Sequence, residues 1–76
     1  MNCRPHFDGT AAELQDLVES QGINGKWLRD GEGLRYLTPD GGILLWYGPI
    51  IRLIVFQGKD PGKTMLREKL GRCFAA

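Results

Sequence analysis

Apolar residues follow one another almost without interruption from residue 43 to residue 57, in the segment ILLWYGPIIRLIVFQ. Gly48 and Pro49 divide this segment into two strand-like runs. A strand with one solvated face alternates apolar and polar residues, whereas a continuous apolar run indicates that both faces are covered. A chain of 76 residues has little material with which to cover both faces itself. The pattern therefore predicts a sheet face that is filled by a protein partner, by a second copy of the chain, or by flat apolar groups such as nucleic acid bases.

Four segments have the composition of β-strands: residues 26–29, 34–38, 43–47 and 51–57. Stretches rich in Gly, Pro and Asp separate them, including residues 30–33 and 39–42. Because each connection is short, neighbouring strands are expected to pair antiparallel in chain order, as a meander.

A helix is predicted to start after Thr10, because Thr10 and Glu13 have the spacing of a capping box, in which each side chain accepts a hydrogen bond from a free amide. Its apolar positions recur at intervals of three and four residues and comprise Ala11, Leu14, Leu17 and Val18. Gly22 is expected to end this helix in the left-handed conformation.

A second helix is predicted after the last strand, with Asp60 as its N-cap and Pro61 at the first helical position, where no amide is needed. Its apolar stripe consists of Leu66, Leu70 and either Cys73 or Phe74.

These elements predict an α+β fold in the order α-β-β-β-β-α, a four-stranded antiparallel sheet backed on one face by two helices. Both helices are short and apolar on one side only, so the economical arrangement packs both on the same face and leaves the other face open. Residues 1–76 are expected to form one small domain, with an irregular segment at residues 1–9 and a frayed end at residues 73–76.

Ten basic and nine acidic side chains give a formal net charge of +1, which excludes strong global steering toward polyanions or membranes. The distribution is uneven, since residues 1–22 carry one basic and four acidic side chains, and residues 23–76 carry nine basic and five acidic ones. The predicted sheet and second helix therefore form a mildly basic half, which permits anion binding without requiring it.

Cys3 and Cys73 are the two cysteines, and they stand near opposite ends of the chain. With only His6 as a further ligand they do not have the spacing of a zinc site, so we expect no metal. The first residues lack the apolar segment of a secretion signal, and no apolar run is long enough to span a bilayer. We therefore expect a cytoplasmic protein with reduced thiols and no membrane contact, and pairing of Cys3 with Cys73 is the alternative if the termini meet.

Catalytic constellations are scarce in this sequence. His6 stands alone in the irregular first segment, and Ser20 falls at the end of a predicted helix without a histidine partner. The carboxylates are spread over turns and the first helix and form no evident acid and base pair. We therefore expect no enzyme and no cofactor.

Residues 58–64, with the sequence GKDPGKT, are similar in composition to a phosphate-binding loop. That motif needs four residues between its two glycines, whereas Gly58 and Gly62 enclose three. Two interpretations are left open. The favoured one is an ordinary capped helix with a solvated basic edge, and the other is a phosphate site formed by free amides of the helix start together with Lys59 and Lys63.

Arg52 is the residue that assigns the faces of the last predicted strand. An arginine in an otherwise apolar strand is costly to bury, so its side of the strand is predicted to be the open face. By alternation, Ile50, Ile54 and Phe56 lie on the same side. A face that combines arginine with aromatic residues suits base stacking and phosphate contacts. The same residue types are enriched in the hot spots of protein interfaces.

The string VFQGK at residues 55–59, which follows a strand and a turn and leads into a helix, resembles a segment of the small amino-terminal domain of bacterial ribonuclease HIII. The predicted order, with one helix before the sheet and one after it, is also similar. That domain resembles half of the TATA-binding protein, whose curved sheet lies over nucleic acid while the helices back it. The resemblance implies nucleic acid binding by the open face. The turn at residues 47–51 departs from the family because it contains Pro49 and lacks the family's Gly-Lys turn.

The sequence thus predicts a non-catalytic nucleic-acid-binding module, for DNA or RNA, that uses the open sheet face. The alternative is a protein-interaction module that uses the same face, either as a homodimer or as the kind of small inhibitor of a host protein that phages and plasmids carry. The residues expected to make the contacts are Arg35, Trp46, Arg52, Ile54, Phe56, Lys59 and Lys63.

Overall fold

The computed structural model describes residues 5–74, which form two helices and four strands. The elements are α1 (Ala11–Ser20), β1 (Lys26–Asp30), β2 (Gly33–Leu37), β3 (Gly42–Trp46), β4 (Ile54–Gly58) and α2 (Gly62–Leu70). The strands form one antiparallel sheet in the order β1-β2-β3-β4. The predicted α+β class, element order and meander are confirmed. Among the described residues no helix is both long enough and apolar enough to cross a bilayer.

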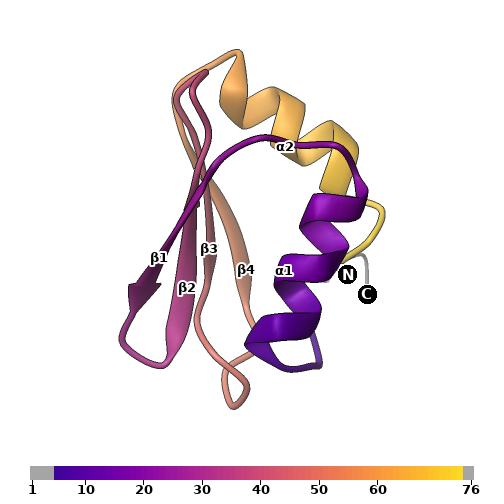
Figure 1. Cartoon of the computed structure of the whole chain (residues 1–76), viewed down its shortest axis with the longest axis vertical. Helices are drawn as coiled ribbons and strands as arrows, with labels where there is room; N and C mark the ends of the chain where they lie inside the picture. The colour runs from indigo at the N-terminus through magenta and orange to yellow at the C-terminus, as the bar shows by residue number, and fades with distance from the viewer. Residues whose placement is uncertain (1–4, 75–76) are drawn as a thin grey trace, which may run out of the picture.

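Both helices lie on the same side of the sheet, as predicted, and no helix or strand of the described chain covers the other side (Figure 1). The second helix packs on β3 and β4. Two glycines permit this close approach, because a Cβ atom built on Gly62 at the start of α2 would lie 2.3 Å from the backbone nitrogen of Gly42 at the start of β3.

The register of the strands assigns every side chain to one of two faces. The core face, which looks toward the helices, consists of two cross-strand rows: Trp27, Tyr36, Leu44 and Phe56, and Arg29, Leu34, Trp46 and Ile54. The open face consists of the two alternate rows: Lys26, Leu37, Ile43 and Gln57, and Leu28, Arg35, Leu45 and Val55. The core joins the buried side chains of the core face to residues from the helical layer: Leu14, Val18, Leu66, Leu70 and Phe74.

The prediction that Trp46, Ile54 and Phe56 belong to the open face is wrong. Trp46 and Ile54 are each 2% exposed, and Phe56 packs against the core. The prediction treated Arg52 as part of a strand over residues 51–57, but β4 begins at Ile54. Arg52 has a φ of 64°, in the left-handed region, where the side-chain alternation of an extended strand does not hold. Arg52 therefore gives no information on which way β4 faces.

The first helix starts as the sequence predicts. The Glu13 side chain accepts a hydrogen bond from the Thr10 amide at 2.9 Å, and the Thr10 hydroxyl accepts one from the Glu13 amide at 3.2 Å. Gly22 has the predicted left-handed conformation, with a φ of 72°. The capping box and the glycine are local signals, and both are confirmed.

The second helix starts one residue later than predicted, because Gly62 is its first residue and Pro61 is its N-cap. Asp60 still caps it, since its Oδ1 atom accepts hydrogen bonds from the amide of Thr64 at 3.1 Å and from its hydroxyl at 2.6 Å. At the other end Phe74, not Cys73, completes the apolar stripe and is 1% exposed.

The hydroxyl of Tyr36 joins the sheet to the segment after α1. It donates a hydrogen bond of 2.8 Å to the carbonyl oxygen of Ile23. Burial raises the pKa of Tyr36 above its usual value, and the negative charge of Glu19 raises it further. The phenol therefore stays protonated as a donor in the core.

We expect Leu66→Ala to lower the free energy of unfolding by about 2–5 kcal/mol, because the side chain is 0% exposed and its removal leaves a cavity between α2 and the sheet. Urea denaturation measures this change. The matched control is Leu28→Ala on the open face, where the side chain is 38% exposed and the loss should stay below about 1 kcal/mol. Equal losses for the two variants would show that α2 is not docked on the core face.

Candidate interaction surface

The open face carries aliphatic side chains, whereas the sequence predicted a mixture of aromatic residues and arginine. Leu45, on the central strand β3, is 8% exposed, while Leu28, on the edge strand β1, is 38% exposed. Leu37, Ile43 and Val55 are half-buried. Since no described element covers these side chains, the face is an apolar surface available for contact (Figure 1).

Arg35 is the one predicted site residue that lies on the open face. Its Nη2 atom is 3.1 Å from Oδ2 of Asp30, and the two side chains are 45% and 48% exposed. An exposed pair of this kind adds little stability. It does give the open face one positive and one negative charge side by side, so a phosphate at Arg35 would compete with Asp30.

The loop between β3 and β4, residues 47–53, presents the most exposed large apolar side chains of the described chain. We name it the isoleucine loop, because Ile50 is 77% exposed and Ile51 is 65% exposed. Two backbone hydrogen bonds close it: Tyr47 N–H to the Leu53 carbonyl at 3.1 Å and Arg52 N–H to the Gly48 carbonyl at 2.8 Å. Ile50 and Ile51 therefore project from a hydrogen-bonded loop at the end of the sheet.

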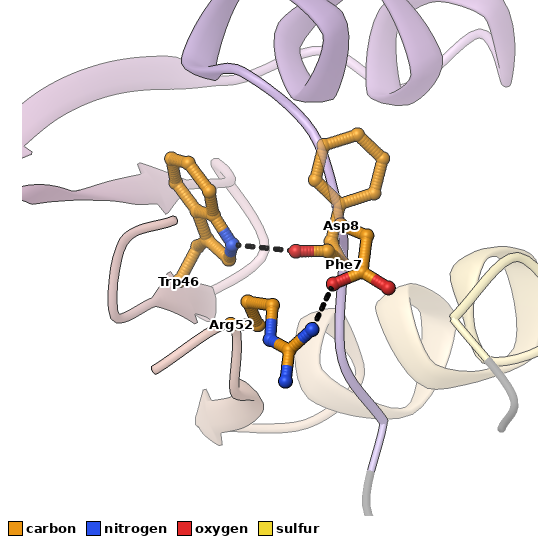
Figure 2. Close-up of polar contacts among 4 residues, drawn as sticks. All are labelled: Phe7, Asp8, Trp46 and Arg52. Atoms are coloured by element: carbon orange, nitrogen blue, oxygen red, sulfur yellow. Dashed lines mark hydrogen bonds and ion pairs between the residues drawn. The ribbon is translucent and has the colours of Figure 1, made fainter. Parts of the chain in front are cut away.

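Residues 5–8, which we name the strap, hold this loop from the helix side (Figure 2). Phe7 donates its N–H to the Arg52 carbonyl at 2.8 Å, and Nε1 of Trp46 donates to the Phe7 carbonyl at 3.3 Å. The Arg52 guanidinium reaches Oδ1 of Asp8 at 2.8 Å. A left-handed conformation costs an ordinary residue about 1–2 kcal/mol. The strap contacts offset that cost, and they account for the position of Arg52, which is in the loop and not on the open face.

Lys59 and Lys63 lie where β4 gives way to α2, away from the open face. Two amides of the helix start are already used, since Lys63 N–H donates to the Lys59 carbonyl at 2.9 Å and Thr64 N–H donates to Asp60. The hydrogen bonds from Thr64, with a smaller contribution from the charge of Lys63, hold the pKa of Asp60 below its usual value. The start of α2 is therefore a capped helix, as the favoured interpretation predicts, and a phosphate site there has less support.

A cavity of about 270 Å³ lies between the start of α1, the β1–β2 turn and the isoleucine loop. Its lining includes Leu34 and Trp46 together with the oppositely charged Arg29 and Glu32. Residues 5–74 contain no group of three or more His, Cys, Asp or Glu side chains that could hold a metal ion. Cys73 is exposed with a free thiol, and Cys3 lies outside the described residues.

The predicted contact residues thus fall into four places and do not form one site. The sets are Arg35 on the open face, Arg52 in the isoleucine loop, Trp46, Ile54 and Phe56 on the core face, and Lys59 and Lys63 before and at the start of α2. The residues that the sequence analysis missed are the aliphatic ones of the open face. Alternation around Arg35 is the signal that identifies them, because it places Leu37 on the face opposite to Tyr36.

Comparison of the chain with protein-family models, with curated proteins and with solved structures finds no match. The resemblance to the amino-terminal domain of ribonuclease HIII stays a prediction.

We expect Arg52→Gly to be more stable than Arg52→Ala by about 1 kcal/mol. Both variants lose the ion pair with Asp8, but only glycine adopts a φ of 64° without strain. Urea denaturation of both variants measures the difference. Arg35→Gly and Arg35→Ala in the extended strand β2 are the controls. There the alanine variant should be the more stable one, because glycine weakens a strand. Equal or greater stability of Arg52→Ala would show that residue 52 is extended.

Proposed function

We propose that this chain is a protein-interaction domain that pairs with a second copy of itself through the open sheet face. The observation that supports the proposal is the aliphatic character of that face, which no described element covers. Packing this face against the same face of a second copy removes apolar surface from water, which is the main favourable contribution to the free energy of protein association. Two sheets packed face to face lie about 10 Å apart, with the helices of both copies outside.

The size of the face indicates how strong the pairing is. Four strands of about five residues span roughly 19 by 17 Å, given strand spacings of about 4.8 Å and a rise of about 3.4 Å per residue. These dimensions give a footprint of about 320 Å², whereas a standard interface buries about 800 Å² of accessible surface on each partner, so this face lies below the standard range. We therefore expect a reversible dimer whose population depends on concentration.

The charges of the face are compatible with self-pairing. In a two-fold interface each residue meets the same surface patch of the partner. Each copy carries the Arg35–Asp30 pair together with Lys26, so groups of both signs are present on the face. A face with charge of a single sign would repel itself, and this face avoids that cost.

Nucleic acid binding has less support from this surface. Base stacking needs exposed aromatic rings, whereas Trp27, Tyr36, Trp46 and Phe56 belong to the core face. Tyr47, at 41% exposure, is the aromatic residue of the isoleucine loop. Arg35, the arginine of the open face, already has a carboxylate partner. The open face therefore suits a protein partner better than nucleic acid.

We expect the wild-type chain to show a reversible monomer–dimer equilibrium in sedimentation velocity, and Leu28→Glu to remain a monomer at concentrations where the wild type is dimeric. The cross-strand neighbour of position 28 is Arg35, which already pairs with Asp30. A carboxylate added at position 28 would therefore lose its water in the dimer without gaining a partner of its own, which is costly, but it stays solvated in the monomer, where the side chain is 38% exposed. A thermal melt checks that the variant folds.

Ala12→Glu is the matched control, because Ala12 is exposed on α1, on the opposite side of the sheet, and the change in charge is the same. It should dimerise as the wild type does. A wild-type chain that stays monomeric at every concentration contradicts the proposal. If that monomer binds a single-stranded oligonucleotide with a salt slope of about −0.7 per phosphate, nucleic acid binding takes its place.

A further inference from the structure

The two edges of the sheet differ in charge. The edge strand β1 has the sequence KWLRD, with three charged residues, whereas the edge strand β4 has the sequence IVFQG and none. Charged side chains on an edge strand discourage pairing with a further strand. The edge of β4 is therefore the one that favours strand addition.

The strap pairs with the first part of this edge. Ile54 donates its N–H outward to the Pro5 carbonyl at 2.9 Å, and His6 forms an antiparallel bridge with Leu53. In an antiparallel strand the outward-facing backbone groups recur at every second residue, so Phe56 is the next to face outward. Within residues 5–74 no backbone group pairs with the outer side of Phe56.

A groove of about 340 Å³ runs beside this part of the edge. Its lining consists of Pro5, Leu53, Ile54, Val55, Phe56 and Arg67. The apolar members come from the strap, from β4 and from Leu53 at the end of the isoleucine loop, and the one charged member comes from α2. The groove therefore combines a strand edge that is unpaired within residues 5–74, apolar walls and a single basic side chain.

The charge of the groove indicates what fills it. Arg67 is the charged residue of the groove lining, and it stands one helical turn after Lys63 on α2. The hydrogen bonds from Thr64 and, to a lesser extent, the charges of both residues lower the pKa of Asp60, which stands before α2, so the positive charge of this rim is partly balanced. Two copies joined edge to edge about a two-fold axis would bring these basic rims together, which disfavours a second copy. A segment with acidic side chains complements the rim.

We propose that the outer edge of β4 binds an extended acidic segment of a partner protein by strand addition, in which the backbone of the segment pairs with Phe56 and a carboxylate meets Arg67. Side chains of an added strand alternate between the two faces of the sheet. The positions on the helix side are acidic, toward Arg67, and the positions on the open side are apolar, beside Leu53 and Val55. This interaction uses backbone groups and is distinct from pairing through the open face.

The experiment uses the full chain and a capped eight-residue peptide in which Glu and Val alternate, with fluorescence anisotropy as the measure of affinity. Two peptides serve as controls: one in which Lys replaces Glu, and one in which alternate amides are N-methylated. We expect each control to bind at least about tenfold more weakly, since the first reverses a charge-assisted contact and the second removes strand hydrogen bonds. Hydrogen exchange at the Phe56 amide should slow when the acidic peptide is bound.

Arg67→Glu should weaken binding of the acidic peptide by at least about tenfold. Lys69→Glu is the matched control, because it makes the same charge change two residues away, where the side chain points to the opposite side of α2 and does not line the groove. It should change the affinity by less than about twofold. Circular dichroism checks that both variants fold, and the peptide pair and the exchange measurement test the proposal without any variant.

The proposal is overturned if the acidic peptide does not bind, if either control peptide binds equally well, or if exchange at Phe56 is unchanged in the complex. Repeating the titration with Leu28→Glu separates this site from the open face. If Leu28→Glu binds the acidic peptide with the same affinity as the wild type, the edge site is independent of the open face. If Leu28→Glu does not bind it, the peptide occupies the open face and the proposal is overturned.

Discussion

Burial of the large side chains of the sheet against two helices is the constraint on which the rest of the structure depends. Trp46 and Tyr36 are 2% and 1% exposed, and both belong to the core face. Once they point inward, the two-residue period of a strand sends Leu45 and Arg35 outward. The chain has 76 residues and uses both of its helices on one face. The second face is left uncovered because no further described element is available for it.

Contacts between distant parts of the chain decide where β4 begins. The strap, residues 5–8, lies beside the end of β3. Its Phe7 carbonyl accepts a hydrogen bond from Trp46, and its Asp8 forms an ion pair with Arg52 (Figure 2). These contacts hold Arg52 in the left-handed region, which interrupts the extended backbone at this residue, and β4 begins at Ile54. The same strap pairs with Leu53 and Ile54 and covers the first part of the sheet edge. One short segment thus shapes both the isoleucine loop and the groove beside Phe56.

The two surfaces that result differ in their chemistry. The open face offers aliphatic side chains, whose association is driven by the loss of apolar surface from water and depends little on direction. The edge of β4 offers backbone donors and acceptors, which require an extended partner in register. Charge separates them further, because the open face carries the balanced pair of Arg35 and Asp30, whereas the groove beside β4 is basic through Arg67.

The sequence by itself determined the elements that depend on neighbouring residues. The capping box of Thr10 and Glu13, the left-handed Gly22 and the first three strands were predictable because their signals lie within a few residues of one another. The predicted fold class followed, since short connections leave few ways to arrange two helices and four strands.

The tertiary structure alone decided which side of the sheet each residue of the apolar hairpin faces. In the run from residue 43 to residue 57 both alternating sets are apolar, so the pattern holds no information that distinguishes them. Arg52 is the one charged residue of that run, and its conformation depends on Asp8 and Phe7, which are more than forty residues away in the chain. A left-handed backbone held by such distant contacts leaves no local signal, which is why the candidate site was placed on the wrong face.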